Sequence, residues 1–373
     1  MRIAIEAQRI FRTNKHGMDF VVLEAIRELQ QIDKINEYYI FVSPGEDRCL
    51  EETDNFHIVE VKCPTYPLWE QWALPRAVAR YKPDLLHCTS NTAPIYCNIP
   101  LVLTLHDIIF LEPRQHRSAS LYQDLGWYYR RFVVPKILDK CSKIITVSNF
   151  ECQRIKEALA IDAERIICIY NGFSSRFGQL TEVSPEIVQR YIPHEEYLFF
   201  LGNTDPKKNV ARTLKAYAMY LKSSSKRLPL LIADIKEEFV DAILKSDGIE
   251  EIRPYIYLPG YISHQDLPHI YKGAFAFLYT SLRESFGIPQ LEAMASGTPV
   301  ITSNTSAMPE VAGAGAILTN PFEPQTIADA LLHLESDSSF YQSQVAYGLE
   351  RILHFSWRGT AEEMLRVYEQ IVG

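Results

Sequence analysis

The sequence lacks the features that would mark a membrane-spanning or nucleic-acid-binding protein. None of its 373 residues belongs to an apolar run near the roughly 18–20 residues that a membrane-spanning helix needs. Lys and Arg, 38 in number, are fewer than the 46 Asp and Glu, and the net charge of −8 argues against nucleic acid as a partner. A predicted strand starts at residue 2, so we expect no signal peptide.

The cysteines form no pattern typical of a disulfide or zinc framework. There are seven of them, an odd number, all between Cys49 and Cys168, and no two form a Cys-x-x-Cys pair. We therefore expect neither disulfides nor a structural zinc site, and a reducing cytoplasmic setting fits this usage. The chain also contains no Asp-x-Asp motif, and nothing in it indicates a bound cofactor.

Length and patterning indicate two α/β domains. A chain of 373 residues is too long for one compact core, and 47% hydrophobic with 23% charged residues is typical of globular proteins. Short apolar runs alternate with helical stretches, which predicts parallel sheets with helices on both faces and ligands at the carboxyl ends of strands. The expected strands are 2–7, 38–42, 57–61, 85–87, 101–105 and 143–147, then 197–201, 228–233, 256–258, 274–279 and 300–302.

The most informative stretch is 279–310. It reads as the end of a strand, a polar loop, a helix with Pro289 in its first turn and Gly297 after its end, and a second strand. The start of such a helix carries free N–H groups and positive partial charge, so it suits a phosphate. The candidate backbone donors there are Ser285, Phe286 and Gly287.

Two glutamates accompany this predicted phosphate site. Glu284 precedes the helix and Glu292 lies within it. A phosphate would repel both carboxylates, so we expect them to accept hydrogen bonds from the hydroxyl groups of a sugar and a ribose. Taken alone, two surface glutamates at the start of a helix are the more ordinary interpretation.

The complete segment 284–300, ESFGIPQLEAMASGTPV, resembles the signature of the retaining glycosyltransferases of the group-1 type (family 4), roughly E-G-F-G-x-P-x-x-E-A-M-A-x-G-x-P-V. Ser285 replaces a usual glycine and keeps the backbone donor. The resemblance implies the GT-B fold, in which two Rossmann-like, doubly wound parallel-sheet domains face each other across a cleft. We expect an acceptor-side domain at 1–175, with a C-terminal helix at about 357–373 crossing back onto it, and a nucleotide-sugar-binding domain at 176–356.

Two further segments, in the first half, resemble the family. Gly17 ends the polar loop 13–17 between a strand and a helix, where the family's glycine loop meets the donor, and Asp19 stands at the place of a second glycine. A plain strand–helix turn explains Gly17 equally well. His106 lies in the segment TLHD (104–107), which resembles the family's T-x-H-D, whose histidine faces the donor sugar and phosphate. A lone histidine at a strand end is more often structural.

Two segments of the second half also match. Lys208, in the loop 202–209, stands at the lysine of the family's diphosphate site, while Asn203 replaces an arginine found in many members. A solvated loop is the alternative for this segment. The loop after the strand at 256–258 holds the nucleobase in the family, mostly through backbone groups, and Ile262 is the candidate side chain there. The polar segment 174–193 is expected to cross between the domains.

The stretch 108–138 mixes aromatic and basic residues. It is interpreted either as an amphipathic surface that contacts anionic lipid or a lipid-linked acceptor, or as a partly buried helix with a solvated basic face. Its aromatic and apolar residues are Phe110, Leu121, Tyr122, Trp127, Tyr128, Tyr129, Phe132 and Val133, and its basic residues are Arg114, Arg117, Arg130, Arg131 and Lys136.

The resemblance implies a retaining, metal-independent hexosyltransferase. The absence of Asp-x-Asp agrees with this, since that motif carries the metal in the other glycosyltransferase fold. The donor would be a nucleotide-diphosphate sugar, GDP-mannose or a UDP-sugar, and the acceptor a glycan or lipid-linked molecule in surface polysaccharide or lipopolysaccharide synthesis. Peripheral contact with the inner membrane surface is part of this hypothesis. The candidate catalytic residues are His106 and Glu284, and the candidate donor-binding residues are Gly17, Asn203, Lys208, Ile262, Ser285, Phe286, Gly287 and Glu292.

Other classes of function stay open. One is a transferase of the sucrose-synthase type with a small soluble acceptor, and another is a non-catalytic nucleotide-sugar sensor. A phosphorylase of related fold would need a pyridoxal phosphate lysine and a much longer chain.

Overall fold

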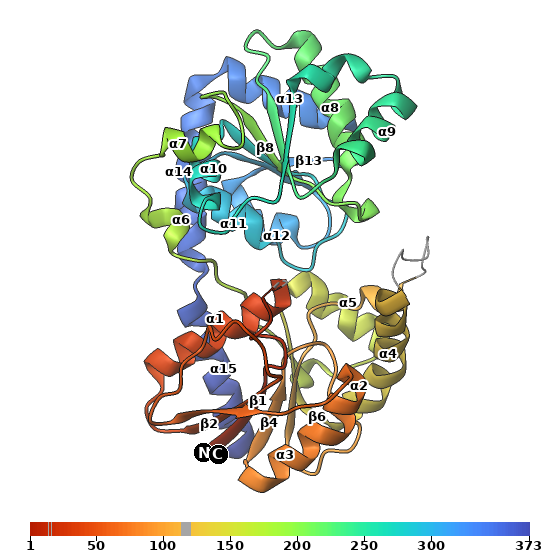
Figure 1. The fold of residues 1–373 in the computed structure, drawn as a ribbon, viewed down its shortest axis with the longest axis vertical. Coiled ribbons are helices and arrows are strands. Elements are labelled where there is room, and N and C mark those ends of the chain that lie inside the picture. The colour runs from red at the N-terminus through yellow and green to blue at the C-terminus, as the bar shows by residue number, and fades with distance from the viewer. Residues whose placement is uncertain (14, 16, 113–120) are drawn as a thin grey trace. The chain divides into compact units, whose positions relative to one another are not determined.

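A computed structural model describes residues 1–13, 15, 17–112 and 121–373 of the chain, with only the backbone of 121–123. It consists of two compact units, both drawn in Figure 1. The first unit comprises Met1–Gly172 together with Ser356–Gly373, and the second comprises Phe173–Phe355. Each is a layered α/β structure in which helices cover both faces of a parallel sheet.

The first sheet has the strand order β3-β2-β1-β4-β5-β6-β7, and all its pairs are parallel. The order reverses between β1 and β4, and ligands of doubly wound sheets bind near such a point, beyond the carboxyl ends of the strands. The bounds are β1 (Arg2–Glu6), β2 (Glu37–Val42), β3 (Phe56–Glu60), β4 (Leu85–Cys88), β5 (Leu101–Thr104), β6 (Cys141–Thr146) and β7 (Ile166–Cys168).

Alternate strand residues of the first sheet enter two separate cores. On one face, α1 (Gly17–Ile32) and α15 (Trp357–Val372) pack together over residues such as Ile3 and Ile5. The other face, which includes Ala4, is covered by α3 (Leu74–Tyr81), α4 (Leu121–Ile137) and α5 (Asn149–Leu159). The chain returns to this unit beside Gly172, where a Cβ atom would lie 2.2 Å from the Trp357 nitrogen, so only glycine fits.

The second sheet has the order β10-β9-β8-β11-β12-β13, again all parallel. One face of this sheet is covered by α8 (Val210–Ser223), α9 (Glu237–Asp247) and α13 (Pro324–Ser336). On the other face, Tyr271 of α10 (Leu267–Gly273) packs against Phe199 and Phe277, and α11 (Ile288–Ala295) contacts α10 and α14 (Ser338–Arg351). The strands are β8 (Leu198–Leu201), β9 (Leu230–Ala233), β10 (Ile256–Gly260), β11 (Ala276–Tyr279), β12 (Val300–Ser303) and β13 (Ile317–Thr319).

The predicted fold class of two doubly wound parallel-sheet domains is confirmed. The edge strands β7 and β13, of three residues each, were not predicted. The segment 174–193, expected as a linker, instead forms α6 (Arg176–Gln179) and α7 (Pro185–Gln189) within the second unit. Phe177 of this segment is buried and packs against Tyr271. The polar composition of the segment gave no indication of this contact.

Candidate active site

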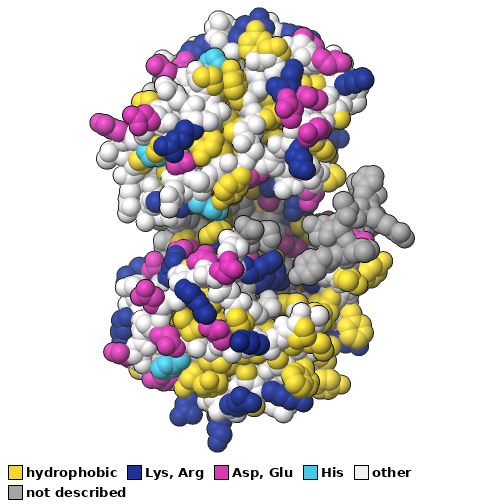
Figure 2. Space-filling view, viewed as in Figure 1, with side chains coloured by type: hydrophobic (Ala, Val, Ile, Leu, Met, Phe, Trp, Pro, Cys, Tyr) yellow, Lys and Arg dark blue, Asp and Glu magenta, His cyan; other side chains and the backbone are white. Residues whose placement is uncertain are grey.

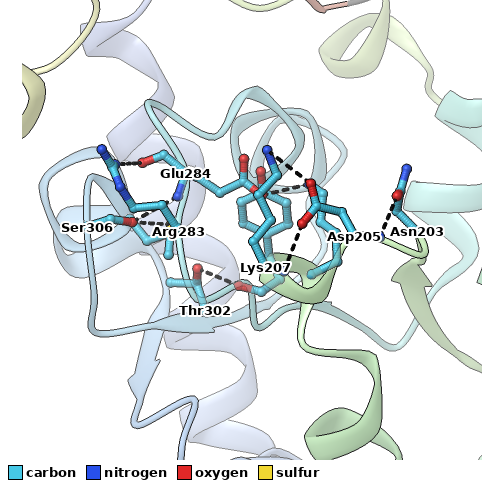
Figure 3. Close-up of polar contacts among 10 residues, drawn as sticks. Asn203, Asp205, Lys207, Arg283, Glu284, Thr302 and Ser306 are labelled. Atoms are coloured by element: carbon cyan, nitrogen blue, oxygen red, sulfur yellow. Dashed lines mark hydrogen bonds and ion pairs between the residues drawn. The ribbon is translucent and has the colours of Figure 1, made fainter. Parts of the chain in front are cut away.

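Loops that follow β8 and β11 meet at the carboxyl edge of the second sheet. The Leu282 N–H donates to the Lys207 carbonyl at 2.7 Å, and Asn209 Nδ2 donates to the Thr280 carbonyl at 3.0 Å. The segment 205–209 between them is a short turn in which the Asp205 carboxylate accepts the Lys207 N–H at 3.0 Å. These bonds hold the lysine-bearing loop of β8 against the loop that carries Glu284 (Figure 3).

Lys208 and Glu284 form an ion pair across these two loops. Lys208 Nζ lies 2.6 Å from Glu284 Oε1, and the two side chains are only 22% and 14% exposed. Burial alone would raise the pKa of Glu284, but Lys208 and Lys207 outweigh it and hold that pKa below its usual value. Glu284 is therefore a carboxylate at neutral pH, and the charge of Lys208 is already matched.

The loop after β12 fixes the backbone of Glu284. Its N–H donates to Ser306 Oγ at 3.1 Å, and its carbonyl accepts from Arg283 Nη1 at 3.2 Å, both visible in Figure 3. Ser306 itself has a positive φ of 51°, which is uncommon for a residue with a side chain. Three loops of one sheet edge thus converge on Glu284.

The start of α11 has the geometry of an anion site. Gly287 precedes the helix with φ of 107°, and a Cβ there would lie 2.8 Å from Gln290 Nε2 and 3.2 Å from Tyr279 Cε1. Only glycine fits both the backbone and the space. Pro289 occupies the first turn, and no side chain caps it. Ser285 and Phe286 lie directly before Gly287, and Phe286 is buried, with its ring edge-on to Phe355.

Glu292 lies on α11 in a half-buried position. Burial raises its pKa to about 7, while the Arg176 charge and the Tyr271 hydroxyl oppose this rise. Tyr279 interacts with both glutamates, which together with burial raise the pKa of its phenol well above 10. Glu284 and Glu292 therefore border a common tyrosine instead of lying on an open surface.

In the first unit, His106 follows β5 and is 5% exposed. Its backbone N–H donates to Asn91 Oδ1 at 2.7 Å, and its ring atom Nε2 lies 3.0 Å from the Thr89 carbonyl oxygen. A carbonyl only accepts, so Nε2 carries the ring proton and Nδ1 keeps a lone pair. Burial lowers the pKa of His106, although the Thr89 carbonyl and Asp107 oppose it, so the imidazole is neutral at pH 7.

The remaining predicted residues are less distinctive. Gly17 is the first residue of α1, and no atom lies within 4 Å of a Cβ added there, so space does not require glycine. Asn203 is exposed, and its side chain accepts the Asp205 N–H at 2.9 Å, a local turn bond. Ile262 is 3% exposed and offers little surface to a base, whereas its neighbour Tyr261 is 66% exposed.

Arg176, which contributes positive charge beside Glu292 from α6, was not among the predicted site residues. Tyr271, Tyr279 and Ser306, which border the two glutamates, were not predicted either. The charge of Arg176 in a polar segment was one signal, but Arg176 lies more than 100 positions before Glu292, and a contact of that range leaves no trace in a local pattern.

The stretch 108–138 has a core face and an exposed face. On α4, Val133, Val134 and Ile137 are buried, whereas Leu125, Tyr128 and Phe132 are 57–68% exposed at helical spacing. Gln71 Nε2 donates to Tyr129 Oη at 2.8 Å, which places the neighbouring turn of Leu68 and Trp72 beside α4. Arg114, Arg117 and the side chains of Leu121 and Tyr122 lie outside the described residues.

We call the exposed apolar residues in this region the aromatic face: Leu68, Trp72, Tyr96, Leu125, Tyr128 and Phe132. Cations lie over its rings, with Arg76 at 4.0 Å from the Trp72 centroid and Lys136 at 3.9 Å from that of Phe132. Figure 2 shows hydrophobic side chains mixed with Lys and Arg at the lower right, where Figure 1 draws α4, α2 and α3.

Among residues 1–13, 15, 17–112 and 121–373, no helix is long and apolar enough to cross a membrane. The same residues contain no cluster of three or more His, Cys, Asp or Glu that could hold a metal ion. All seven cysteines are free thiols.

Two doubly wound sheets, one with a lysine–glutamate pair beside an uncapped helix start, define a protein of the nucleotide-binding α/β class. Two family models match most of the chain: Glycosyltransferase Family 4 over residues 16–176, and Glycosyl transferases group 1 over residues 187–351. The chain belongs to the group 1 glycosyltransferases and is a glycosyltransferase with the GT-B fold.

Curated relatives include two mannosyltransferases of Escherichia coli. The O-antigen chain mannosyltransferase B is 29% identical, over 82% of this chain and 78% of that protein. The serotype-specific mannosyltransferase WbdA is 25% identical over 79% of this chain, but the match spans only 38% of that longer protein.

Solved structures agree with the fold along the whole chain. Sucrose-phosphate synthase from Thermosynechococcus elongatus superposes with a TM-score of 0.74 at 19% identity, covering 99% of this chain and 98% of the other. HepE from Anabaena, solved with UDP-glucose, has a TM-score of 0.73 at 16% identity, covering 99% and 100%. At these identities the likeness concerns the fold alone.

Proposed function

We propose that the protein is a retaining hexosyltransferase that moves mannose or glucose from a nucleotide-diphosphate sugar to a glycan or lipid-linked acceptor. The observation that carries this proposal is the convergence of Lys208, Glu284 and the uncapped start of α11 at one sheet edge, with Glu292 on the same helix. A cation and the N–H groups at the start of a helix suit a diphosphate, and two carboxylates suit hydroxyl groups.

In this proposal the second unit holds the donor. The diphosphate takes Lys208 and the N–H groups of 285–287, which stabilise negative charge as it develops on the leaving group. Once Lys208 has turned to the phosphate, Glu284 is available to accept from the sugar hydroxyls. Glu292 accepts from the ribose, and Arg176 adds positive charge beside it. Asn203 and the backbone around Ile262 belong to the base and phosphate side of the same site.

The chemical step that we favour is a front-side displacement. The bond between the anomeric carbon and the phosphate oxygen breaks, the acceptor oxygen bonds to the same face of that carbon, and the acceptor proton moves to the departing phosphate. Retention follows because both events use one face. Glu284 as a covalent nucleophile is the alternative.

The first unit supplies the acceptor side, with Gly17 and His106 at the carboxyl edge of its sheet. His106 is neutral and holds its ring proton on Nε2 toward Thr89, so Nδ1 is the atom that can accept a hydrogen bond from a substrate hydroxyl. We therefore expect His106→Ala to lower turnover more than donor affinity.

Mannose is the sugar that we favour, and cell-surface polysaccharide or lipopolysaccharide synthesis is the setting. Support comes from the names of two relatives, an O-antigen chain mannosyltransferase and a serotype-specific mannosyltransferase. GDP-mannose is accordingly the first donor to test, and UDP-glucose the second, because HepE was solved with it.

We also propose that the aromatic face contacts the inner membrane surface, where a lipid-linked acceptor would be found. Exposed rings with cations lying over them are suited to the boundary between anionic headgroups and acyl chains. On α4, Leu125, Tyr128 and Phe132 form one stripe.

Release of nucleoside diphosphate from GDP-mannose and UDP-glucose, with and without a lipid-linked sugar acceptor, tests the proposal. We expect one donor to be consumed by the wild type, faster with acceptor, and not by Glu292→Ala. Binding of a donor without any turnover or slow hydrolysis would favour a non-catalytic nucleotide-sugar sensor. Transfer only to a small soluble sugar would favour a sucrose-synthase-like role.

A further inference from the structure

Glu70 is a buried carboxylate in the first unit that the proposed mechanism does not use. It is 0% exposed and lies in a π-helical turn, Trp69–Ala73, between α2 (Tyr66–Leu68) and α3. Such turns are rare and occur often at functional sites. Among the described residues, no Lys, Arg or His pairs with Glu70, although a buried carboxylate normally has such a partner.

Four side-chain donors hold this carboxylate instead of a cation. The hydroxyls of Tyr66, Thr92 and Tyr129 lie 2.6, 2.5 and 2.5 Å from its oxygens, and Gln71 Nε2 lies 2.8 Å away. Burial raises the pKa of Glu70, and these hydrogen bonds oppose the rise. An apolar side chain would fill the same space without desolvating a charge, so packing alone does not explain the glutamate.

Two of the four donors come from segments that are distant in the sequence. Thr92 belongs to the segment 89–100 between β4 and β5, and Tyr129 belongs to α4. Gln71 reinforces the same junction, because its amide donates to the Ala93 carbonyl at 3.0 Å and accepts the Ile95 N–H at 2.8 Å. Glu70 and Gln71 together therefore fasten the segment that follows β4.

That fastened segment carries both partners of His106. Asn91, with a positive φ of 68°, accepts the His106 N–H, and the Thr89 carbonyl accepts from the His106 ring. Asn91 and Thr92 are consecutive residues. The residue that hydrogen-bonds to Glu70 is therefore the direct neighbour of the residue that hydrogen-bonds to His106. A shift of Thr92 moves Asn91 and, through the backbone N–H of His106, the residue that carries the imidazole.

We propose that Glu70 is a positioning residue that orients His106 through the segment 89–95. This inference rests on the proposed role of His106 in the transfer reaction. Without the carboxylate, the hydroxyls of Thr92 and Tyr129 lose their common acceptor, the segment relaxes, and the His106 ring no longer has a fixed direction. A misplacement of about 1 Å is enough to cost on the order of a hundredfold in rate.

The test compares Glu70→Gln with Asp33→Asn in the full-length protein. Asp33 is a matched control because it is a 4% exposed carboxylate of the same unit that accepts from Tyr38 Oη at 2.6 Å, but it lies before β2, at the amino edge of the sheet. We expect both variants to lose thermal stability. Glu70→Gln alone should lower kcat, on the order of tenfold or more, with unchanged donor Kd.

A spectroscopic measurement reports directly on the surroundings of the His106 imidazole. In protein labelled with ¹⁵N-histidine, the His106 ring signal should shift or broaden in Glu70→Gln and remain in place in Asp33→Asn. An unchanged His106 signal together with normal kcat in Glu70→Gln would overturn the proposal. If Glu70→Gln fails to fold, Thr92→Val and Thr92→Ser replace it, since only serine keeps the hydroxyl and should keep kcat.

His106→Ala distinguishes the proposed role of His106 from that of Glu70. Full kcat in His106→Ala would refute its proposed role in the reaction, while the ring signal in Glu70→Gln would still decide whether Glu70 positions it. Low kcat in His106→Ala with normal kcat in Glu70→Gln would leave the proposed function standing and refute the positioning role.

Discussion

Lys208 and Glu284 lie 76 positions apart in the sequence, yet Lys208 Nζ is 2.6 Å from Glu284 Oε1 in a largely buried ion pair. The residue proposed to bind the diphosphate is thus paired with the residue proposed to bind the sugar. A donor must separate the two charges, and both then acquire new partners on the same ligand. The pair keeps each side chain in place before the donor arrives.

Glu284→Gln should affect binding and turnover in opposite directions. The amide no longer competes with phosphate for Lys208, so the affinity for a nucleoside diphosphate should rise, on the order of tenfold or about 1.4 kcal/mol. Turnover of the nucleotide sugar should fall strongly. Calorimetric titration with GDP and UDP, paired with donor turnover, measures both. Weaker nucleotide binding in this variant would show that the pair does not compete with phosphate.

Lys208→Ala should weaken nucleoside diphosphate binding far more than Lys207→Ala. Lys207 is the matched control, since it is adjacent, 37% exposed and only 3.8 Å from Asp205. Loss of Lys208 also leaves Glu284 without its main cation, so the melting temperature should drop, and Glu284→Gln in the same protein should restore part of it. Equal affinities of the two single variants for nucleoside diphosphate would show that Lys208 does not belong to the donor site.

Glu292 should make stability depend on pH near neutrality. Its pKa is about 7 in the folded protein against 4.5 for the free side chain. The unfolded chain therefore ionises first, and folding stability is lost as the pH rises from about 4.5 through 7. Glu292→Gln should melt higher relative to wild type at pH 8 than at pH 5. A pH-independent difference would contradict the raised pKa.

Glu292 should also release a proton when the donor binds. Ribose hydroxyls donate to the ionised form of Glu292, so they lower its pKa and expel a proton near pH 7. Calorimetry of nucleotide binding in two buffers of different ionisation enthalpy should reveal this release in wild type and not in Glu292→Gln.

Serine substitutions at Leu125, Tyr128 and Phe132 should reduce binding to anionic vesicles without affecting donor binding. Phe322→Ser is the control, because Phe322 is 54% exposed and also has a cation over its ring, Arg212 at 5.4 Å. Flotation with phosphatidylglycerol-containing vesicles measures this. No flotation of the wild type, or equal loss in the control, would refute the membrane contact.

The sequence was sufficient to predict the sheets because buried parallel strands are continuous apolar runs, as in 101–105 and 197–201. It predicted the start of α11 as well, because Gly287 and Pro289 have local conformational effects. It could not reveal that Lys208 pairs with Glu284 or that Arg176 charges the surroundings of Glu292, since both depend on long-range packing. It also gave no indication of the hydrogen bonds to Glu70, whose donors come from three separate segments.

The most direct test of the account is donor turnover by wild type and Glu292→Ala under identical conditions. We predict that wild-type protein releases GDP from GDP-mannose, or UDP from UDP-glucose, in an acceptor-stimulated reaction that gives a glycoside with the anomeric configuration of the donor. Glu292→Ala should bind the donor more weakly and release little. Inversion of configuration, or equal binding and turnover in the two proteins, would contradict the proposed site and mechanism.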